Sequence, residues 1–154
     1  MHGDWGLSSG WRWTNFPLPE AHLVLIVTGV ALGLVKPFAL GLSSPAASIL
    51  GTALVLLGIA LMIWATRTAG RVKLADDVQL IMVGPYRLSR HPMYLAWTFL
   101  YLGLLLLLDS GWLVVLIPIL ALWVHWESGK EEHRLIESFG SAYVQYQEKV
   151  RRYL

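Results

Sequence analysis

Four long apolar runs, nearly free of charged side chains, constrain the fold of this chain more than any other feature of its sequence. A helix needs about 20 mostly apolar residues to cross the ~30 Å hydrocarbon core of a bilayer, and about 17 can suffice. The runs cover roughly Glu20–Leu40, Pro45–Thr66, Pro92–Leu108 and Gly111–Trp126. The last two are short, and the turn between them is formed by residues 109–111, which indicates a tight hairpin. We therefore predict an all-α integral membrane protein with four transmembrane helices.

Composition supports this class and excludes several kinds of chemistry. Hydrophobic residues make up 56% of the chain and charged residues only 14%, whereas a soluble domain is about a quarter charged. The chain has no cysteine, which excludes disulfides, thiolate metal sites and a cysteine nucleophile. A net charge of +2 is too small to indicate nucleic-acid binding, and we expect no metal site.

The basic residues predict the orientation in the membrane. Ten of the 12 lysines and arginines follow the second or the fourth apolar run: Arg67, Arg71, Lys73, Arg87, Arg90, Lys130, Arg134, Lys149, Arg151 and Arg152. The two opposite loops, residues 41–44 and 109–111, contain none. Because short cytoplasmic loops are enriched in basic residues, we expect both termini and both basic stretches on the cytoplasmic side of an inner or cell membrane.

The C-terminal part changes character but keeps a helical pattern. After Trp126 the chain becomes charged, while apolar residues recur every three or four positions, at Leu135, Phe139, Tyr143, Tyr146, Val150 and Tyr153. This spacing predicts an amphipathic cytoplasmic helix that lies on the membrane or closes over the bundle. We expect one domain over residues 1–154, with two N-terminal helices in 1–66 and a functional core in 67–154.

Small residues in the second apolar run concern whether two copies of the chain can associate. Gly51 and Gly58 lie seven positions apart and would let another helix approach closely. A homodimer through this face is possible.

Two polar clusters lie where predicted helix ends meet the cytoplasm. The first contains Tyr86, Arg87, Arg90, His91 and Tyr94, and the second contains Glu127, Lys130, Glu131, Glu132, His133 and Arg134. The short hairpin should make these helix ends neighbours, so both clusters would share one cavity. The N-terminus of the third helix favours a carboxylate there, Glu131 suits a cation or a ribose hydroxyl, and the tyrosines suit a base or a sulfonium.

Simpler interpretations of the same residues stay open. Arginines and tyrosines beside a transmembrane helix often only anchor it at the interface, and charges after a last helix often form a solvated surface. His22 and His125, near the cytoplasmic ends of helices one and four, would allow bis-histidine haem ligation if they faced each other.

Two longer motifs resemble a known family. The first runs from residue 79 to 94 and contains Gly-Pro-Tyr-Arg-Leu-Ser-Arg-His-Pro-Met-Tyr; the second runs from 131 to 146 and contains Glu-Glu-His-Arg-Leu, Phe-Gly and two spaced tyrosines. Together they are similar to the signature of the isoprenylcysteine carboxyl methyltransferase family, whose wider group includes membrane phospholipid methyltransferases. Some sterol reductases share Arg-His-Pro-x-Tyr alone, so an NADPH-dependent reductase is a rival, although 154 residues supply too few helices for it.

The resemblance implies an S-adenosylmethionine-dependent methyltransferase that takes a lipid-like or lipophilic small substrate from the bilayer. Carried over position by position, the family's cofactor contacts fall on Leu80, Ile81, Tyr86, His91, Pro92, Met93, Tyr94 and Glu131. A non-enzymatic membrane scaffold or lipid-binding protein that retains the fold is the alternative.

One position departs from the carboxyl methyltransferases that the chain resembles. They carry an arginine one helical turn before the first glutamate of the Glu-Glu pair, where this chain has Glu127. A negative group there would repel a carboxylate and attract an amine, such as that of an ethanolamine phospholipid. The catalytic candidates are then Glu127 or Glu132 as a base, together with Arg90.

Overall fold

The computed structural model describes residues 20–75 and 80–153, and these residues are helical throughout apart from connecting segments. The elements are α1 (Glu20–Val35), α2 (Pro45–Ala75), the short 3-10 helix η2 (Gly84–Arg87), α3 (Pro92–Leu107), α4 (Gly111–Phe139) and α5 (Ser141–Lys149). Within the described ranges the extended pairing is limited to one isolated bridge, between Ala39 and Ser110. The N-terminus, predicted to be cytoplasmic, lies outside these ranges.

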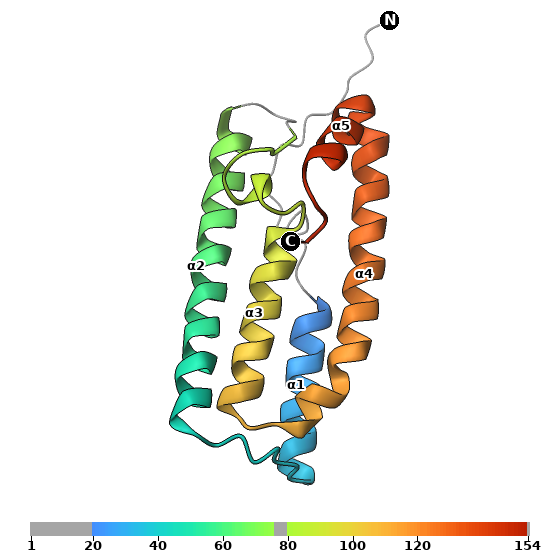
Figure 1. The fold of residues 1–154 in the computed structure, drawn as a ribbon. Coiled ribbons are helices and arrows are strands. Elements are labelled where there is room, and N and C mark those ends of the chain that lie inside the picture. Colours follow the sequence, from blue (N-terminus) through green and yellow to red (C-terminus); the bar gives the residue numbers. More distant parts are fainter. Residues whose placement is uncertain (1–19, 76–79, 154) are drawn as a thin grey trace, which may run out of the picture.

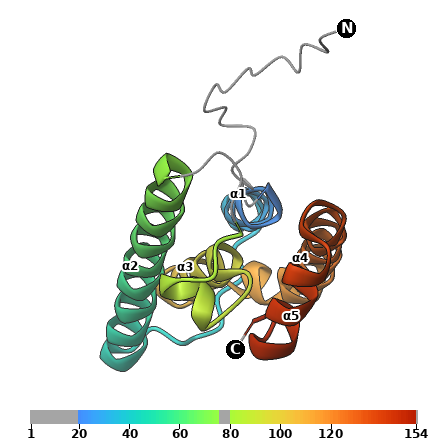
Figure 2. The same cartoon turned by 90° about the horizontal axis from the view of Figure 1, so that it is seen from above.

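The four long helices run side by side and form a bundle (Figure 1). Helix α2 packs along α3, α1 packs along α4, and the contacts between these two pairs are less extensive. The short elements η2 and α5, together with the C-terminal segment, gather at the end of the bundle where α3 begins (Figures 1 and 2). The predicted all-α class is therefore confirmed for the described residues.

Helix length bears directly on the predicted four crossings. Helices α2 and α4 each contain a stretch long and apolar enough to cross a membrane. Helices α1 and α3 have 16 residues each, which is about 24 Å at 1.5 Å per residue and less than the ~30 Å core. Four crossings thus stay a prediction, while two membrane-length helices are observed.

The helix ends differ from the apolar runs. Helix α1 stops at Val35, just before Lys36-Pro37, because proline lacks the amide hydrogen that a further helical turn would use. Helices α2 and α4 instead continue past Thr66 and Trp126 into charged sequence, to Ala75 and Phe139. Helical hydrogen bonding does not require apolar side chains, so the end of an apolar run is a poor guide to the end of a helix.

The single C-terminal helix that the sequence predicts is interrupted in the structure. Its first part is the end of α4, Gly140 then interrupts the helix at φ +54°, and α5 follows. A positive φ costs glycine little. Val150 leaves the helix in an extended conformation, so Val150 and Tyr153 do not continue the predicted helical face. Tyr143 and Tyr146 are buried, which places α5 against the end of the bundle.

Asp109 joins the two loops at the opposite end of the bundle. Its carboxylate accepts hydrogen bonds from the backbone N–H of Gly41 and Leu42, at 3.2 and 2.9 Å, and from the Ser43 hydroxyl at 3.1 Å. The backbone hydrogen bond from Leu42 is the main reason that the pKa of Asp109 is lowered. The α3–α4 hairpin is thereby tied to the α1–α2 connection, which holds the two helix pairs in register.

Glycines bring α2 and α3 into backbone contact. A Cβ atom on Gly58 would lie 2.7 Å from the carbonyl oxygen of Ala96, and one on Gly51 would lie 3.0 Å from that of Gly103. The small-residue face of α2 is therefore covered by α3 of the same chain. The homodimer stays a prediction, and it loses the surface on which it was based.

Replacing Gly103 by alanine should separate α2 from α3. The new Cβ would lie 2.7 Å from the carbonyl oxygen of Gly51 and 2.9 Å from the backbone nitrogen of Val55, and backbone atoms cannot turn aside as side chains do. We expect a loss of about 1–3 kcal/mol of stability, measured by thermal unfolding in detergent. Gly33→Ala is the matched control, because nothing lies within 4 Å of its added Cβ. Equal melting temperatures for the two variants would contradict this packing.

Candidate functional site

The segment that enters α3 is shaped by a glycine and two prolines. Gly84 has φ +61°, and a Cβ there would meet the Thr68 hydroxyl of α2 at 2.7 Å. Pro85 and Pro92 are both fully buried. Pro92 occupies the first turn of α3, where its missing amide hydrogen costs nothing. From Gly84 onward this segment is therefore held against α2, and it presents His91 at the start of α3.

Inward-facing residues of α3 and α4 form the walls of the site. On α3, His91, Tyr94, Thr98 and Tyr101 recur every three or four residues and so share one helical face. On α4, Glu127 and Glu131 extend the face that carries the buried Leu120 and Val124 deeper in the bundle. The polar residues of both helices thus lie at the same end of the bundle, where α3 begins.

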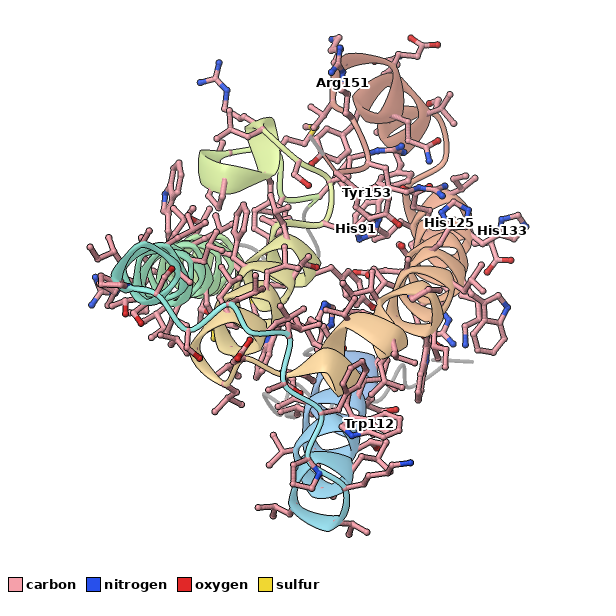
Figure 3. All side chains as sticks on the ribbon, turned by 60° about the horizontal axis from the view of Figure 1, so that its bottom comes forward. His91, Trp112, His125, His133, Arg151 and Tyr153 are labelled. Atoms are coloured by element: carbon pink, nitrogen blue, oxygen red, sulfur yellow. The ribbon has the colours of Figure 1, made fainter. Side chains whose placement is uncertain are left out.

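His91 connects the two motifs directly. Its Nε2 atom lies 3.1 Å from Oε1 of Glu132, and its Nδ1 atom lies 3.4 Å from Oε2 of Glu131. The His91 side chain is 2% exposed, and Figure 3 shows His91 at the start of α3, on the side that faces α4. The structure thus brings together the two motifs that the sequence predicted to converge.

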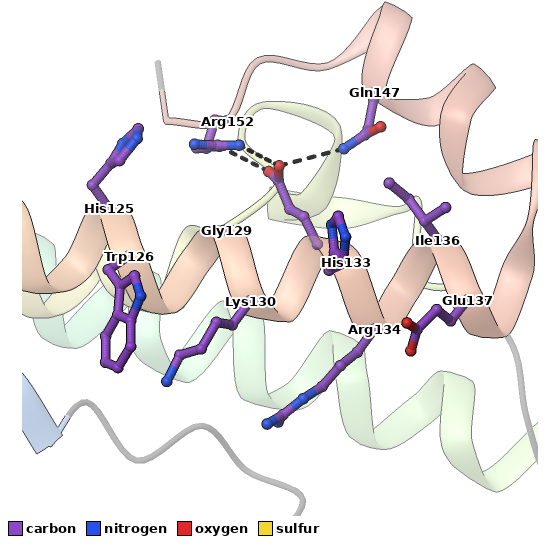
Figure 4. Close-up of a pocket in the computed structure, with 11 residues that line it drawn as sticks. His125, Trp126, Gly129, Lys130, His133, Arg134, Ile136, Glu137, Gln147 and Arg152 are labelled. Atoms are coloured by element: carbon purple, nitrogen blue, oxygen red, sulfur yellow. Dashed lines mark hydrogen bonds and ion pairs between the residues drawn. The ribbon is translucent and has the colours of Figure 1, made fainter.

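Glu132 is the most highly connected residue of the site. Its carboxylate, 5% exposed, contacts Arg90 Nη1 at 3.1 Å and Arg152 at 3.0 and 2.5 Å. Gln147 donates a further hydrogen bond at 3.3 Å, and these contacts are partly visible in Figure 4. The hydrogen bond to Glu132 raises the pKa of Arg152. With its oxygens occupied in this way, Glu132 is better suited to holding α3, α4 and the C-terminal segment together than to accepting a proton.

The C-terminal segment reinforces this connection through its backbone. The carbonyl oxygen of Arg151 accepts a hydrogen bond from the Arg90 N–H at 3.0 Å, and that of Arg152 accepts one from the Ser89 hydroxyl at 3.1 Å. The Tyr153 hydroxyl lies 3.0 Å from that of Ser128 on α4. Sequence reasoning treated Arg151 and Arg152 only as part of a basic flank, because no local pattern indicates that this segment folds back.

Tyr86 faces the site from η2. Burial, with a smaller contribution from the Glu131 carboxylate, raises the pKa of the Tyr86 hydroxyl to about 12. It is therefore a neutral hydrogen-bond donor at any physiological pH. Its backbone carbonyl accepts a hydrogen bond of 2.5 Å from the Tyr146 hydroxyl of α5, so α5 fixes the position of η2.

Glu131 differs from its neighbour in having unused hydrogen-bonding capacity. Its side chain is 36% exposed, yet its Oε2 atom is buried and has no hydrogen-bond partner among the described residues. It lies beside His91 and acts electrostatically on the hydroxyls of Tyr86 and Tyr94. A buried carboxylate oxygen without a partner is costly, and a ribose hydroxyl or a cationic group of a ligand would satisfy it.

Glu127 lies one helical turn before Glu131 on α4 but has a partner. Lys130 Nζ is 2.6 Å from its carboxylate and 3.6 Å from the centre of the Trp126 ring. The side chain of Glu127 is about one-third exposed and acts electrostatically on Tyr94. The negative charge that distinguishes this chain therefore faces the site, partly neutralised by Lys130.

The other predicted cofactor contacts are more peripheral. Leu80 and Ile81 precede η2 and are half-buried, and Met93 is buried in the first turn of α3. Pro92 lines an apolar groove of about 300 Å³ between α2 and α3 instead of the polar cluster. The wall of this groove also includes Leu57, Leu61, Trp64, Pro85, Leu95 and Phe99.

A larger groove of about 830 Å³ lies on the outer face of α4 (Figure 4). It is lined by His125, Trp126, His133, Arg134 and neighbouring residues, together with Gln147 and Arg152. Of the second predicted cluster it includes Lys130, Glu132, His133 and Arg134, and it includes no residue of the first. His125 lies in this outer groove, whereas His22 is buried against α3, so the arrangement does not favour haem ligation by this pair.

Taken together, the described residues form a helical bundle with two membrane-length apolar helices and a cluster of carboxylates, imidazole and tyrosines at one end. The sequence profile of the phospholipid methyltransferase family matches residues 46–142, which include the first motif and the second as far as residue 142. The chain belongs to this family.

One curated relative adds detail to the comparison. The protein-S-isoprenylcysteine O-methyltransferase of Saccharomyces cerevisiae is 35% identical over 123 residues, which cover 75% of this chain and 52% of the relative. The chain thus spans about half the length of that relative. No solved structure matches this chain significantly.

Proposed function

We propose that this protein is an integral membrane methyltransferase that uses S-adenosylmethionine and acts on a lipid-like acceptor with an amine head group. The observation that supports it most is the convergence of His91, Tyr86 and Tyr94 on Glu131, whose buried Oε2 atom lacks a partner among the described residues. Membership of the phospholipid methyltransferase family and the similarity to an O-methyltransferase support the same reaction class.

The residues present suit the methyl donor. When bound, S-adenosylmethionine would supply a methyl group on a positively charged sulfur. Glu131 would accept hydrogen bonds from ribose hydroxyls, and the rings of Tyr86 and Tyr94 would favour the cationic sulfur through cation–π attraction. Leu80, Ile81 and Met93 would provide apolar surface around the nucleoside.

The chain's own contribution to catalysis would consist mainly of positioning. Holding two reactants in attack geometry supplies several kcal/mol, and Glu132 provides rigidity by joining Arg90, His91 and Arg152. The C-terminal segment packs over the start of α3 and would limit the access of water. Glu127 is the better candidate for the group that accepts a proton from the acceptor nitrogen, because Glu132 is fully engaged.

The walls of the groove between α2 and α3 are almost entirely apolar, and at one end it reaches Pro85 and Pro92. This groove would accommodate apolar surface of a lipid on the side of α3 that faces α2. We propose that all four long helices cross the membrane, with this end of the bundle on the cytoplasmic side, as the distribution of basic residues indicates.

An amine is the acceptor that the charge distribution favours. The Glu131 carboxylate, beside His91, and the Glu127 carboxylate, paired with Lys130, both act electrostatically on the Tyr94 hydroxyl. Acidic surroundings attract an ammonium group and repel a carboxylate.

Labelled S-adenosylmethionine and a total lipid extract provide the test. Purified protein in detergent should transfer label to an ethanolamine phospholipid, identified by chromatography and mass spectrometry. Label in a lipid methyl ester would retain the methyltransferase but contradict the amine acceptor. No labelled lipid, together with no binding of S-adenosylhomocysteine at millimolar concentration, would indicate a scaffold or lipid-binding protein.

A further inference from the structure

His22 of α1 is a buried polar residue that the function proposed above does not use. It precedes the family match, which begins at residue 46, and its side chain is fully buried. Its ring stacks beside Tyr94, with centroids 6.4 Å apart, and lies 6.5 Å from that of Trp97. Tyr94 in turn lies 5.6 Å from the ring of His91. His22 is therefore continuous with the site but lies deeper in the bundle.

The hydrogen bonds around Thr98 define the protonation of the His22 ring. The Thr98 hydroxyl donates its single hydrogen to the carbonyl oxygen of Tyr94, at 2.8 Å. It must therefore act as the acceptor toward His22 Nε2, which lies 3.1 Å away, so Nε2 carries the hydrogen. In a neutral ring Nδ1 then has a free lone pair.

This lone pair is buried, and no described group donates a hydrogen bond to it. An unsatisfied buried acceptor is destabilising, and a leucine would fill the same space at no such cost. A buried ionisable residue in a membrane helix usually marks a functional site with a specific partner. A hydrogen-bond donor of a bound molecule would satisfy Nδ1.

We propose that His22 Nδ1 accepts a hydrogen bond from the amine head group of the methyl acceptor. This inference rests on the proposed function. From His91 to Thr98 is seven residues along α3, about 10 Å at 1.5 Å per residue, so the methyl donor would lie near His91 and Glu131 and the acceptor head deeper in the bundle, beside His22. The carboxylates around Tyr94 favour a cationic N–H donor over a neutral hydroxyl.

Two variants separate this role from a structural one. His22→Gln keeps an N–H group able to reach Thr98 but removes the Nδ1 acceptor, whereas Thr98→Val removes the structural hydrogen bond and leaves Nδ1 in place. We expect His22→Gln to raise the KM for an ethanolamine phospholipid about 10-fold or more, with unchanged affinity for S-adenosylhomocysteine. Thr98→Val should affect KM much less. The reverse order would assign His22 a purely structural role and overturn the proposal.

A spectroscopic experiment tests the contact without turnover. Protein with ¹⁵N-labelled histidine is placed in nanodiscs of choline phospholipid, whose head group has no N–H donor, and ethanolamine phospholipid is then introduced. The Nδ1 resonance that disappears in His22→Gln should shift only with the ethanolamine lipid. An identical resonance in both lipids would overturn the proposal. A shift without methyl transfer by the unaltered protein would instead contradict the proposed function and leave the contact at His22 intact.

Discussion

Glu132→Gln is expected to destabilise the protein by about 3–5 kcal/mol, which is the cost of breaking a buried ion pair by removing one partner. Glutamine keeps the shape of the side chain but leaves Arg90 and Arg152 without the carboxylate that they share at 3.1 Å and 2.5 Å. For a chain of this size the melting temperature should fall by roughly 10 °C, measured by thermal unfolding in detergent. Methyl-donor binding should weaken as well, because His91 loses one of the groups that orient it.

A second substitution tests whether the ion pair is the cause. Arg152→Gln alone should also destabilise the protein, and the double variant Glu132→Gln/Arg152→Gln should lose less than the sum of the two single changes. Glu148→Gln, on the exposed side of α5, is the matched control and should leave the melting temperature unchanged. Strict additivity of the two single effects would refute the assignment of Glu132 as the residue that joins these elements.

Glu131→Ala should weaken binding of the methyl donor and leave the stability of the fold unchanged, whereas Glu132→Gln should mainly lower stability. The Glu131 side chain is about one-third exposed, and its Oε2 atom has no hydrogen-bond partner among the described residues, so its removal breaks little within the protein. If it holds a ribose hydroxyl or the cationic end of the methyl donor, the affinity for S-adenosylhomocysteine should fall on the order of 100-fold, since a hydrogen bond to a charged group contributes up to about 3 kcal/mol.

Isothermal titration in detergent measures this affinity, and thermal unfolding of the same preparation checks the fold. The melting temperature should stay within a few degrees of that of the unaltered protein. Glu148→Ala is again the control. Unchanged affinity in Glu131→Ala would remove this residue from the proposed cofactor site.

The adjacent glutamates show where sequence reasoning was incomplete. Their motif marked both as site residues, and the structure brings both to His91. Consecutive residues of a helix point about 100° apart, so the two carboxylates meet different partners. Glu132 turns toward Arg152, 20 residues away, while Glu131 lies beside His91 with one oxygen that has no hydrogen-bond partner among the described residues. No spacing rule applied to the sequence predicts that division of roles.

The apolar runs by themselves determined the helical class and the approximate positions of the four long helices. The short hairpin predicted that the two polar motifs converge. Both are local properties of a sequence. Tertiary structure alone decided which groups are engaged and which are free. The return of Arg152 to Glu132 and the pairing of His22 with Thr98, 76 residues away, depend on contacts between distant segments. Such contacts follow from how whole helices pack, and a local pattern does not record them.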